Sequence, residues 1–156
     1  MDVFGDHLVS CNKNNSTQRL IAVRDALAQS LRNHGITCRT EVAIGTRRRP
    51  ADVALDTFDP RGPLAIDLVL HHPLAPSASR EINAMKASMV DEERRKSEES
   101  DELCHSNGWL FTPMCWHLWG DVGPQGAAVL QRLQKAIAGD SQGWVRIQSS
   151  PTSDNG

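Results

Sequence analysis

Two aspartates, each in the middle of a short apolar run, are the residues of this chain whose types and spacing could do chemistry. Asp52 lies in the run 49–55 and Asp67 in the run 64–70, and the composition of both runs predicts buried strands. A carboxylate inside a buried strand is costly unless it is ion-paired, hydrogen-bonded or bound to a metal. One shared partner would explain both aspartates.

The residues between the two runs predict a hairpin. The segment 59–63, Asp-Pro-Arg-Gly-Pro, is rich in residues that reverse the chain. A hairpin could bring Asp52 and Asp67 side by side, where like charges raise each other's pKa unless a cation lies between them. Oxygen ligands suit Mg²⁺ or Mn²⁺. The residues leave an alternative open: one aspartate ends its strand in water, and the other is ion-paired with an arginine of Arg47-Arg48-Arg49.

Composition bounds the architecture and the partners. The chain has 156 residues, 39% hydrophobic and 23% charged, which fits one globular domain with a core of ordinary size. We expect that domain over residues 1–148 and a disordered tail over 149–156, where Ser, Pro, Thr, Asp, Asn and Gly predominate. The net charge of −2 gives no global basic field, although a local basic patch remains compatible with it.

Targeting signals and cysteine usage indicate the compartment. No apolar stretch has the length that a bilayer crossing needs, and the N-terminus lacks the apolar core of a signal peptide. We therefore expect a soluble intracellular protein that is not secreted and has no membrane partner. The cysteines show no paired spacing, so reduced thiols are expected. They are Cys11, Cys38, Cys104 and Cys115.

Hydrophobic periodicity predicts the first helix and the first strand. Ser16-Thr17 offers an N-cap and residues 33–35 supply a stop. Between them, apolar residues recur at helical spacing: Leu20, Val23, Leu27 and Leu31. The segment 36–44 alternates as a strand with two faces would. One face is expected to carry Ile36, Cys38, Val42 and Ile44, and the other Arg39 and Glu41.

The remaining elements follow the two aspartate strands. Prolines make 71–76 a loop, and a long polar helix is predicted from about Ser79 to Cys104. Its charged run 91–102 is interpreted as a solvated face with local ion pairs. A strand over 109–119 and a helix starting at 123–126 complete the chain. The order helix, three strands, helix, strand, helix predicts an α/β layer on a small mixed sheet.

A lysine could complete a hydrolytic metal site, because an ammonium beside the ion can orient the attacking water and stabilise charge on the phosphorane. Neither aspartate strand contains a lysine, but the long helix offers Lys86 and Lys96. At roughly 100° of turn per residue, Lys96 falls within the apolar stripe that should face the sheet, and Lys86 lies at its edge. That stripe holds Ile82, Met85, Met89 and Leu103. The alternative for Lys96 is a packed stem whose amine reaches water.

In this order the residues resemble the PD-(D/E)XK nucleases. The likeness is closest to the restriction-endonuclease-like domain that follows the reverse transcriptase in site-specific non-LTR retrotransposons and in related reverse-transcriptase-like proteins. The motif is Asp52, an interval of fourteen residues, and Asp67. The segments 4–11, 24–27 and 96–113 resemble the family's opening segment, its first helix, and its lysine helix with the last core strand.

The resemblance implies a restriction-endonuclease-like fold, an α-β-β-β-α-β core with a small mixed central sheet flanked by helices. It also implies a metal-dependent endonuclease that hydrolyses DNA phosphodiester bonds, the target-site nicking domain of a retroelement, fused to or acting with a reverse transcriptase in a nuclear or other intracellular setting. On this resemblance Asp52 and Asp67 bind Mg²⁺ or Mn²⁺, Lys96 is a migrated catalytic lysine, and Glu41 is a weaker candidate for an outer carboxylate. Arg47, Arg48 and Arg49 are expected to neutralise DNA phosphates.

The chain departs from the family pattern in two places. The usual Pro-Asp step is Pro50-Ala51-Asp52, and Val69 occupies the position that holds lysine in the standard motif. Activity therefore depends on Lys96. If its amine points to water, the expected alternative is a catalytically inactive nuclease-fold module that binds nucleic acid or another partner. An enzyme for small phosphorylated substrates ranks last, because the chain lacks a Gly-rich phosphate loop.

Histidines and cysteines suggest a zinc site only weakly. His7 and Cys11 form half of one, but the cysteine pair that precedes this segment in the resembling proteins is missing, so zinc is not expected. Because the chain opens inside the segment that resembles the family's opening segment, we expect a further segment upstream. Cys104 with His105, and Cys115 with His117, lack the spacing of standard metal ligands. We therefore expect buried thiols and histidines without a metal-binding role there.

Overall fold

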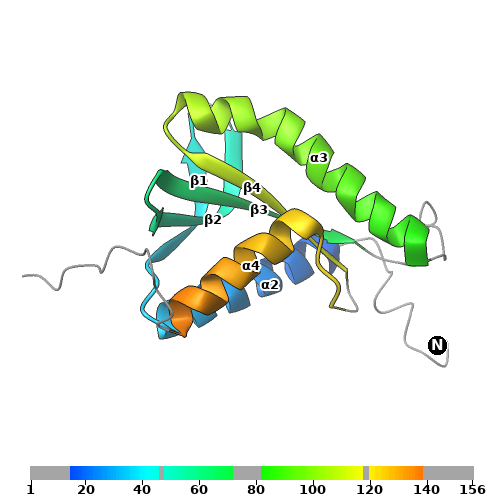
Figure 1. Ribbon diagram of the computed structural model, residues 1–156, viewed down its shortest axis with the longest axis horizontal. Helices are drawn as coiled ribbons and strands as arrows, with labels where there is room; N and C mark the ends of the chain where they lie inside the picture. Colours follow the sequence, from blue (N-terminus) through cyan, green and yellow to red (C-terminus); the bar gives the residue numbers. More distant parts are fainter. Residues whose placement is uncertain (1–14, 46–47, 72–81, 118–119, 139–156) are drawn as a thin grey trace, which may run out of the picture.

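The structure, a computed structural model, describes residues 15–45, 48–71, 82–117 and 120–138 (Figure 1). Within these ranges the chain is an α/β protein with three helices and a mixed four-stranded sheet. In chain order the elements are α2 (Asn15–Asn33), β1 (Cys38–Ile44), β2 (Arg48–Asp59), β3 (Gly62–His71), α3 (Ile82–Ser106), β4 (Leu110–His117) and α4 (Pro124–Ile137). The α/β class, the small mixed sheet and the order of elements predicted from the sequence are confirmed.

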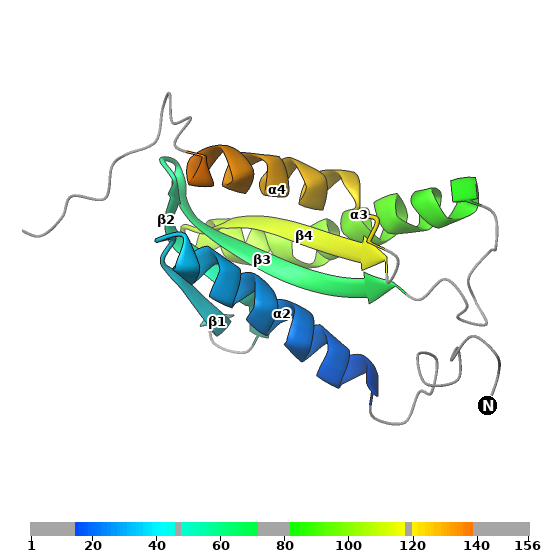
Figure 2. The same ribbon diagram turned by 90° about the horizontal axis from the view of Figure 1, so that it is seen from below.

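The sheet has the strand order β1-β2-β3-β4, with antiparallel pairing up to β3 and parallel pairing between β3 and β4. Parallel neighbours need a crossover connection, and α3 supplies it. Figures 1 and 2 show α3 on one face of the sheet, and α2 and α4 on the other. A side chain that α3 directs at the sheet therefore meets only one of the two faces.

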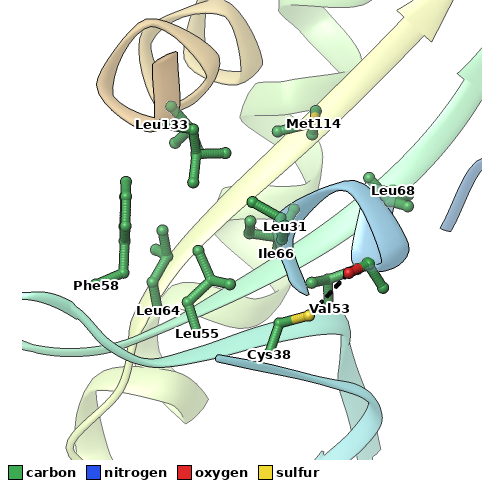
Figure 3. Close-up of a cluster of buried hydrophobic side chains, with 12 residues drawn as sticks. Leu31, Cys38, Val53, Leu55, Phe58, Leu64, Ile66, Leu68, Met114 and Leu133 are labelled. Carbon is green, nitrogen blue, oxygen red and sulfur yellow. Dashed lines mark hydrogen bonds between the residues drawn. The ribbon is translucent and has the colours of Figure 1, made fainter. Parts of the chain in front are cut away.

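The main core lies on the face that α2 and α4 cover. Alternate residues of β3 point into it, and Figure 3 shows Leu64 and Ile66 in one cluster with Leu31 of α2 and Leu133 of α4. Fully burying such a side chain contributes about 1.5–3 kcal/mol. The thiol of Cys38 donates a hydrogen bond to the carbonyl of Ala28 at 3.4 Å, which ties β1 to α2 (Figure 3).

A smaller cluster lies between α3 and the other face of the sheet. It consists of Ile44, Ala51, Ala54, Ala65, Cys104 and Phe111. Ala54 and Ala65 are partners in the β2–β3 ladder. Because both positions carry only the methyl group of alanine, α3 can approach the sheet closely.

The turn between β2 and β3 is held by Asp59, which is almost fully buried. Its carboxylate accepts hydrogen bonds from the backbone and guanidinium of Arg61 and from the guanidinium of Arg132 in α4. The bond to the Arg61 side chain, followed by those to the Arg61 backbone and to Arg132, holds the pKa of Asp59 well below its usual range. This network fixes the hairpin that carries Asp52 and Asp67.

The predicted alternation along β1 is wrong. Cys38 packs in the main core, whereas Val42 and Ile44 pack on the α3 face, so the three do not share one side of the strand. The reason is Glu41, whose φ of 53° lies in the left-handed region and reverses the alternation. Ile36 precedes the strand and packs against the main core.

Several element bounds also differ from the prediction. Helix α2 begins at Asn15, so Ser16-Thr17 lies in its first turn, and α3 runs two residues beyond Cys104, to Ser106. Pro113 lies within β4, which is an edge strand and so tolerates the missing donor. Predictions for residues 1–14, 72–81, 118–119 and 139–156, including the tail, lie outside the described residues. No described helix combines the length and apolar character that spanning a membrane would require.

Candidate active site

Asp52 and Asp67 lie opposite each other on neighbouring strands. The β2–β3 ladder pairs Ala54 with Ala65 and Val53 with Ile66, and the same register places Asp52 across from Asp67. The two carboxyl groups lie close enough for Asp52 to raise the pKa of Asp67. Because Ile66 points into the main core, strand alternation turns Asp67 toward α3.

Lys96 reaches this pair from α3. Its Nζ lies 2.8 Å from Oδ2 of Asp67, and the side chains of the two residues are 25% and 14% exposed. The lysine stem is thus largely covered by protein, and the ammonium is directed at a carboxylate instead of bulk water. Lys86, the other lysine of this helix, is exposed.

One oxygen of each aspartate is already committed to a protein partner. Oδ2 of Asp52 accepts a hydrogen bond from the backbone N–H of Leu68 at 2.8 Å, and Oδ2 of Asp67 faces Lys96. These contacts fix the orientation of both carboxyl groups. They leave Oδ1 of each side chain to share a ligand placed between the two strands.

The pKa of Asp67 is raised from its ordinary 3.8 to about 6. Burial is the largest cause, and the hydrogen bond and charge of Lys96 oppose it, whereas Asp52 raises the value further. When both acids are ionised, two carboxylates and one ammonium leave the site with one negative charge that Lys96 does not neutralise. A second cation beside the aspartates would relieve this excess.

Lys96 remains an ammonium at neutral pH. Burial, the largest single effect, lowers its pKa, but the hydrogen bond and charge of Asp67 outweigh burial, so the pKa lies above the ordinary 10.5. A lysine in this state donates hydrogen bonds and stabilises negative charge. It does not act as a general base.

The structure does not bring Glu41 to this site. Its carboxylate is paired with the guanidinium of Arg24, from the helix that covers the opposite face of the sheet. Arg47 lies outside the described residues, as do the side chains of Arg48 and Arg49, and so do His7 and Cys11. Only Asp52, Asp67 and Lys96 of the predicted site residues are therefore seen to meet.

Within the described ranges no group of three or more His, Cys, Asp or Glu side chains is placed to hold a metal ion. Two facing carboxylates nevertheless suit Mg²⁺, which keeps several waters and takes one or two protein carboxylates together with substrate phosphate oxygens. The donor set and its excess negative charge fit such an ion.

The described cysteines behave as core residues, as expected. Cys38, Cys104 and Cys115 are free and buried. Burial, the main cause, raises the pKa of Cys104 to about 11 and that of Cys115 to about 12. Thiols in this state are poor metal ligands and poor nucleophiles.

Sequence reasoning missed Glu93, which the prediction placed on a solvated face. Its side chain is buried, with 1% exposure, and accepts hydrogen bonds from the backbone at the start of α4. The signal was its spacing: the sheet-facing residues of α3 are Met89, Glu93, Lys96, Ser100 and Cys104, at steps of three or four. Because three of these five residues are polar, hydrophobic periodicity did not reveal the stripe.

Comparisons with models of protein families, with curated proteins and with solved structures found no match to this chain.

Proposed function

We propose that this chain is a Mg²⁺- or Mn²⁺-dependent endonuclease that hydrolyses DNA phosphodiester bonds. The observation that carries the proposal is the convergence of Asp52, Asp67 and Lys96 from two strands and a helix on one face of the sheet. In the resembling nucleases these are the residue types of the catalytic centre, in the same chain order.

The topology supports a restriction-endonuclease-like fold as part of the proposal. Helix α2, the antiparallel strands β1 to β3, the crossover α3 and the parallel strand β4 follow the α-β-β-β-α-β order of that family. The proposed lysine lies on the crossover helix, which compensates for Val69 in the standard lysine position. A shared fold alone would not argue for the activity, because function depends on the site.

The roles of the side chains follow from their contacts. Asp52 and Asp67 would hold the ion through the oxygens not already bonded to Leu68 and Lys96. When bound, a divalent ion supplies Lewis-acid activation of the phosphate and of water. The Lys96 ammonium orients the attacking water by hydrogen bonding and stabilises the charge that develops on the phosphorane.

We further propose that DNA contact involves Arg47, Arg48 and Arg49, which precede Asp52 in the chain. Guanidinium groups bind phosphate oxygens in a bidentate geometry. On the resemblance, the domain would nick the target site of a retroelement and would be fused to, or act with, a reverse transcriptase in the nucleus or elsewhere inside the cell.

A second candidate is an inactive nuclease-fold module that binds nucleic acid. It is favoured by the lack of a third metal-ligating side chain among the described residues and by the ion pair between Lys96 and Asp67, which already partly neutralises the site. Both candidates predict DNA binding, so binding does not separate them.

The test is nicking of supercoiled plasmid in Mg²⁺ and in Mn²⁺, with a chelator as the negative control. We expect metal-dependent nicking by the wild type and none by Asp67→Asn, which should retain DNA affinity because it removes a negative charge and no phosphate contact. Nicking that survives in Asp67→Asn would contradict the assignment. Tight DNA binding without nicking by the wild type would favour the inactive module.

A further inference from the structure

Glu93 lies on the sheet-facing side of α3, one turn before Lys96. Its Oε2 accepts a hydrogen bond from the backbone N–H of Gln125 at 3.0 Å, and its Oε1 accepts one from Gly126 at 3.1 Å. These N–H groups belong to the first turn of α4, whose N-cap, Gly123, has no side chain that could accept them. A carboxylate from another helix thus performs the capping and meets the positive end of the α4 dipole.

The Glu93 carboxylate fits against the start of α4 because Gly123 and Gly126 have no side chains. A Cβ atom on Gly123 would collide with the Glu93 carboxylate, and one on Gly126 would lie 2.8 Å from side-chain atoms of Met114 and Val122. Only glycine at both positions lets the start of α4 approach Glu93 and β4 this closely.

The α4 cap is also bonded directly to the sheet. The N–H of Gly123 donates to the carbonyl of Cys115 in β4 at 2.8 Å. Strand β4 is paired in parallel with β3, where Pro113 lies beside Asp67. A continuous path of hydrogen bonds and strand pairing therefore connects Glu93 to the strand that carries Asp67.

Lys96 lies between two attachment points of α3. Glu93 attaches the helix on one side of it, and Cys104, fully buried against the sheet, attaches it on the other. A helix rises about 1.5 Å per residue, so a slip of a single residue would break the 2.8 Å contact between Lys96 and Asp67.

We propose that Glu93 is a positioning residue of the active site: by fastening α3 to the first turn of α4, it sets the reach of Lys96 to Asp67 and thereby the cleavage rate. This inference rests on the proposed nuclease function. Among the residues that the structure describes, Glu93 contacts the N–H groups of Gln125 and Gly126 and neither aspartate, so we infer that it acts through the helix.

The kinetic test is Glu93→Gln, which keeps the size of the side chain but replaces one acceptor oxygen with an amide donor that cannot cap. We expect kcat for plasmid nicking to fall about tenfold or more, because small displacements of a catalytic group are costly, while KM changes little. In a Lys96→Met background the same substitution should lower kcat no further, although thermal stability should fall in both backgrounds. An equal kcat loss in both backgrounds, or none in either, would overturn the proposal.

The matched control is Leu133→Val, a mild core substitution in α4 away from Glu93. It lowers stability without touching α3, so kcat should stay at the wild-type value. If Leu133→Val lowers kcat as much as Glu93→Gln does, stability and not positioning explains the effect.

A spectroscopic readout separates failure of this inference from failure of the nuclease assignment. In lysine-labelled protein, the side-chain NMR signal of Lys96 is identified by its loss in Lys96→Met, and Glu93→Gln should shift it toward the signal of exposed Lys86. If the wild type does not nick DNA but this shift is seen, the nuclease function fails and the helix attachment stands. If the wild type nicks DNA and Glu93→Gln leaves the Lys96 signal unmoved, the positioning role is wrong.

Discussion

The ammonium of Lys96 lies 2.8 Å from Oδ2 of Asp67, on the face of the sheet that α3 covers. Asp52 adds a second carboxyl group beside Asp67, where it raises the pKa of Asp67. Burial and Asp52 together outweigh the lysine and keep the pKa of Asp67 at about 6. Burial is the largest cause of this raised pKa, so ionised Asp67 is held at a cost that a nearby cation would reduce.

Lys96→Met should keep the fold and remove the activity. Methionine replaces the covered stem with an apolar side chain of similar length, while the ammonium that we propose to stabilise the phosphorane is lost. We expect the nicking rate in Mg²⁺ to fall by roughly two orders of magnitude or more, after circular dichroism has confirmed folding. Lys86→Met, on the same helix but exposed, is the control. A larger loss in the control than in Lys96→Met would reverse the assignment.

Asp67→Asn should stabilise the protein at neutral pH. Because the pKa is raised from 3.8 to about 6, ionised Asp67 destabilises the native state relative to its protonated form. Asparagine resembles the protonated form, so we expect a higher Tm than that of the wild type at pH 7.5, with about 2–4 °C for each kcal/mol gained.

The pH dependence of that gain checks its cause. Between pH 4 and 6 the native state binds more protons at Asp67 than the unfolded chain does, so the wild type loses stability as the pH rises through this window. The variant lacks this loss, and the two Tm values should converge below pH 4. A stability difference that is independent of pH would mean that the carboxyl group is not the origin.

Mn²⁺ should bind with a stoichiometry of one ion per chain. One oxygen of Asp52 is bonded to the Leu68 N–H and one of Asp67 faces Lys96, which leaves too few protein oxygens for two ions about 3.5–4 Å apart. Isothermal titration without DNA measures this directly, and Asp67→Asn should abolish the binding. Two ions per wild-type chain would show that further ligands come from residues outside those described.

The three residues that meet at the site are predictable because each is a polar side chain at a position where periodicity demands an apolar one. Asp52 and Asp67 interrupt strand patterns, and Lys96 interrupts a helical stripe. Burial forces such residues to find partners, so hydrophobic patterning also indicates which face of each element they share. The element order follows from the same periodicities and turn residues.

Other features depend on tertiary contacts that local patterning does not encode. The left-handed φ of Glu41 reverses the faces of β1, although nothing in the alternating residues of that segment indicates it. Glu93 lies within a charged run that predicts a solvent-exposed face. Its burial is explained by the N–H groups at the start of α4, which have no side-chain cap of their own and donate to its carboxylate. Partners that are distant in sequence decide both cases.

Replacing Arg47, Arg48 and Arg49 together with alanine should weaken DNA binding and leave the metal site intact. Each phosphate contact releases counterions, so the slope of log K against log salt should become shallower by about 0.9 per lost contact on duplex DNA, or by up to nearly three for the triple variant. Fluorescence anisotropy at several salt concentrations measures the slope, and Mn²⁺ titration should still show one ion. The control is the pair Arg94→Ala and Arg95→Ala, exposed arginines that form ion pairs within α3. If the control changes the slope as much as the triple variant, DNA lies along α3 and the arginines before Asp52 are not the phosphate-binding residues.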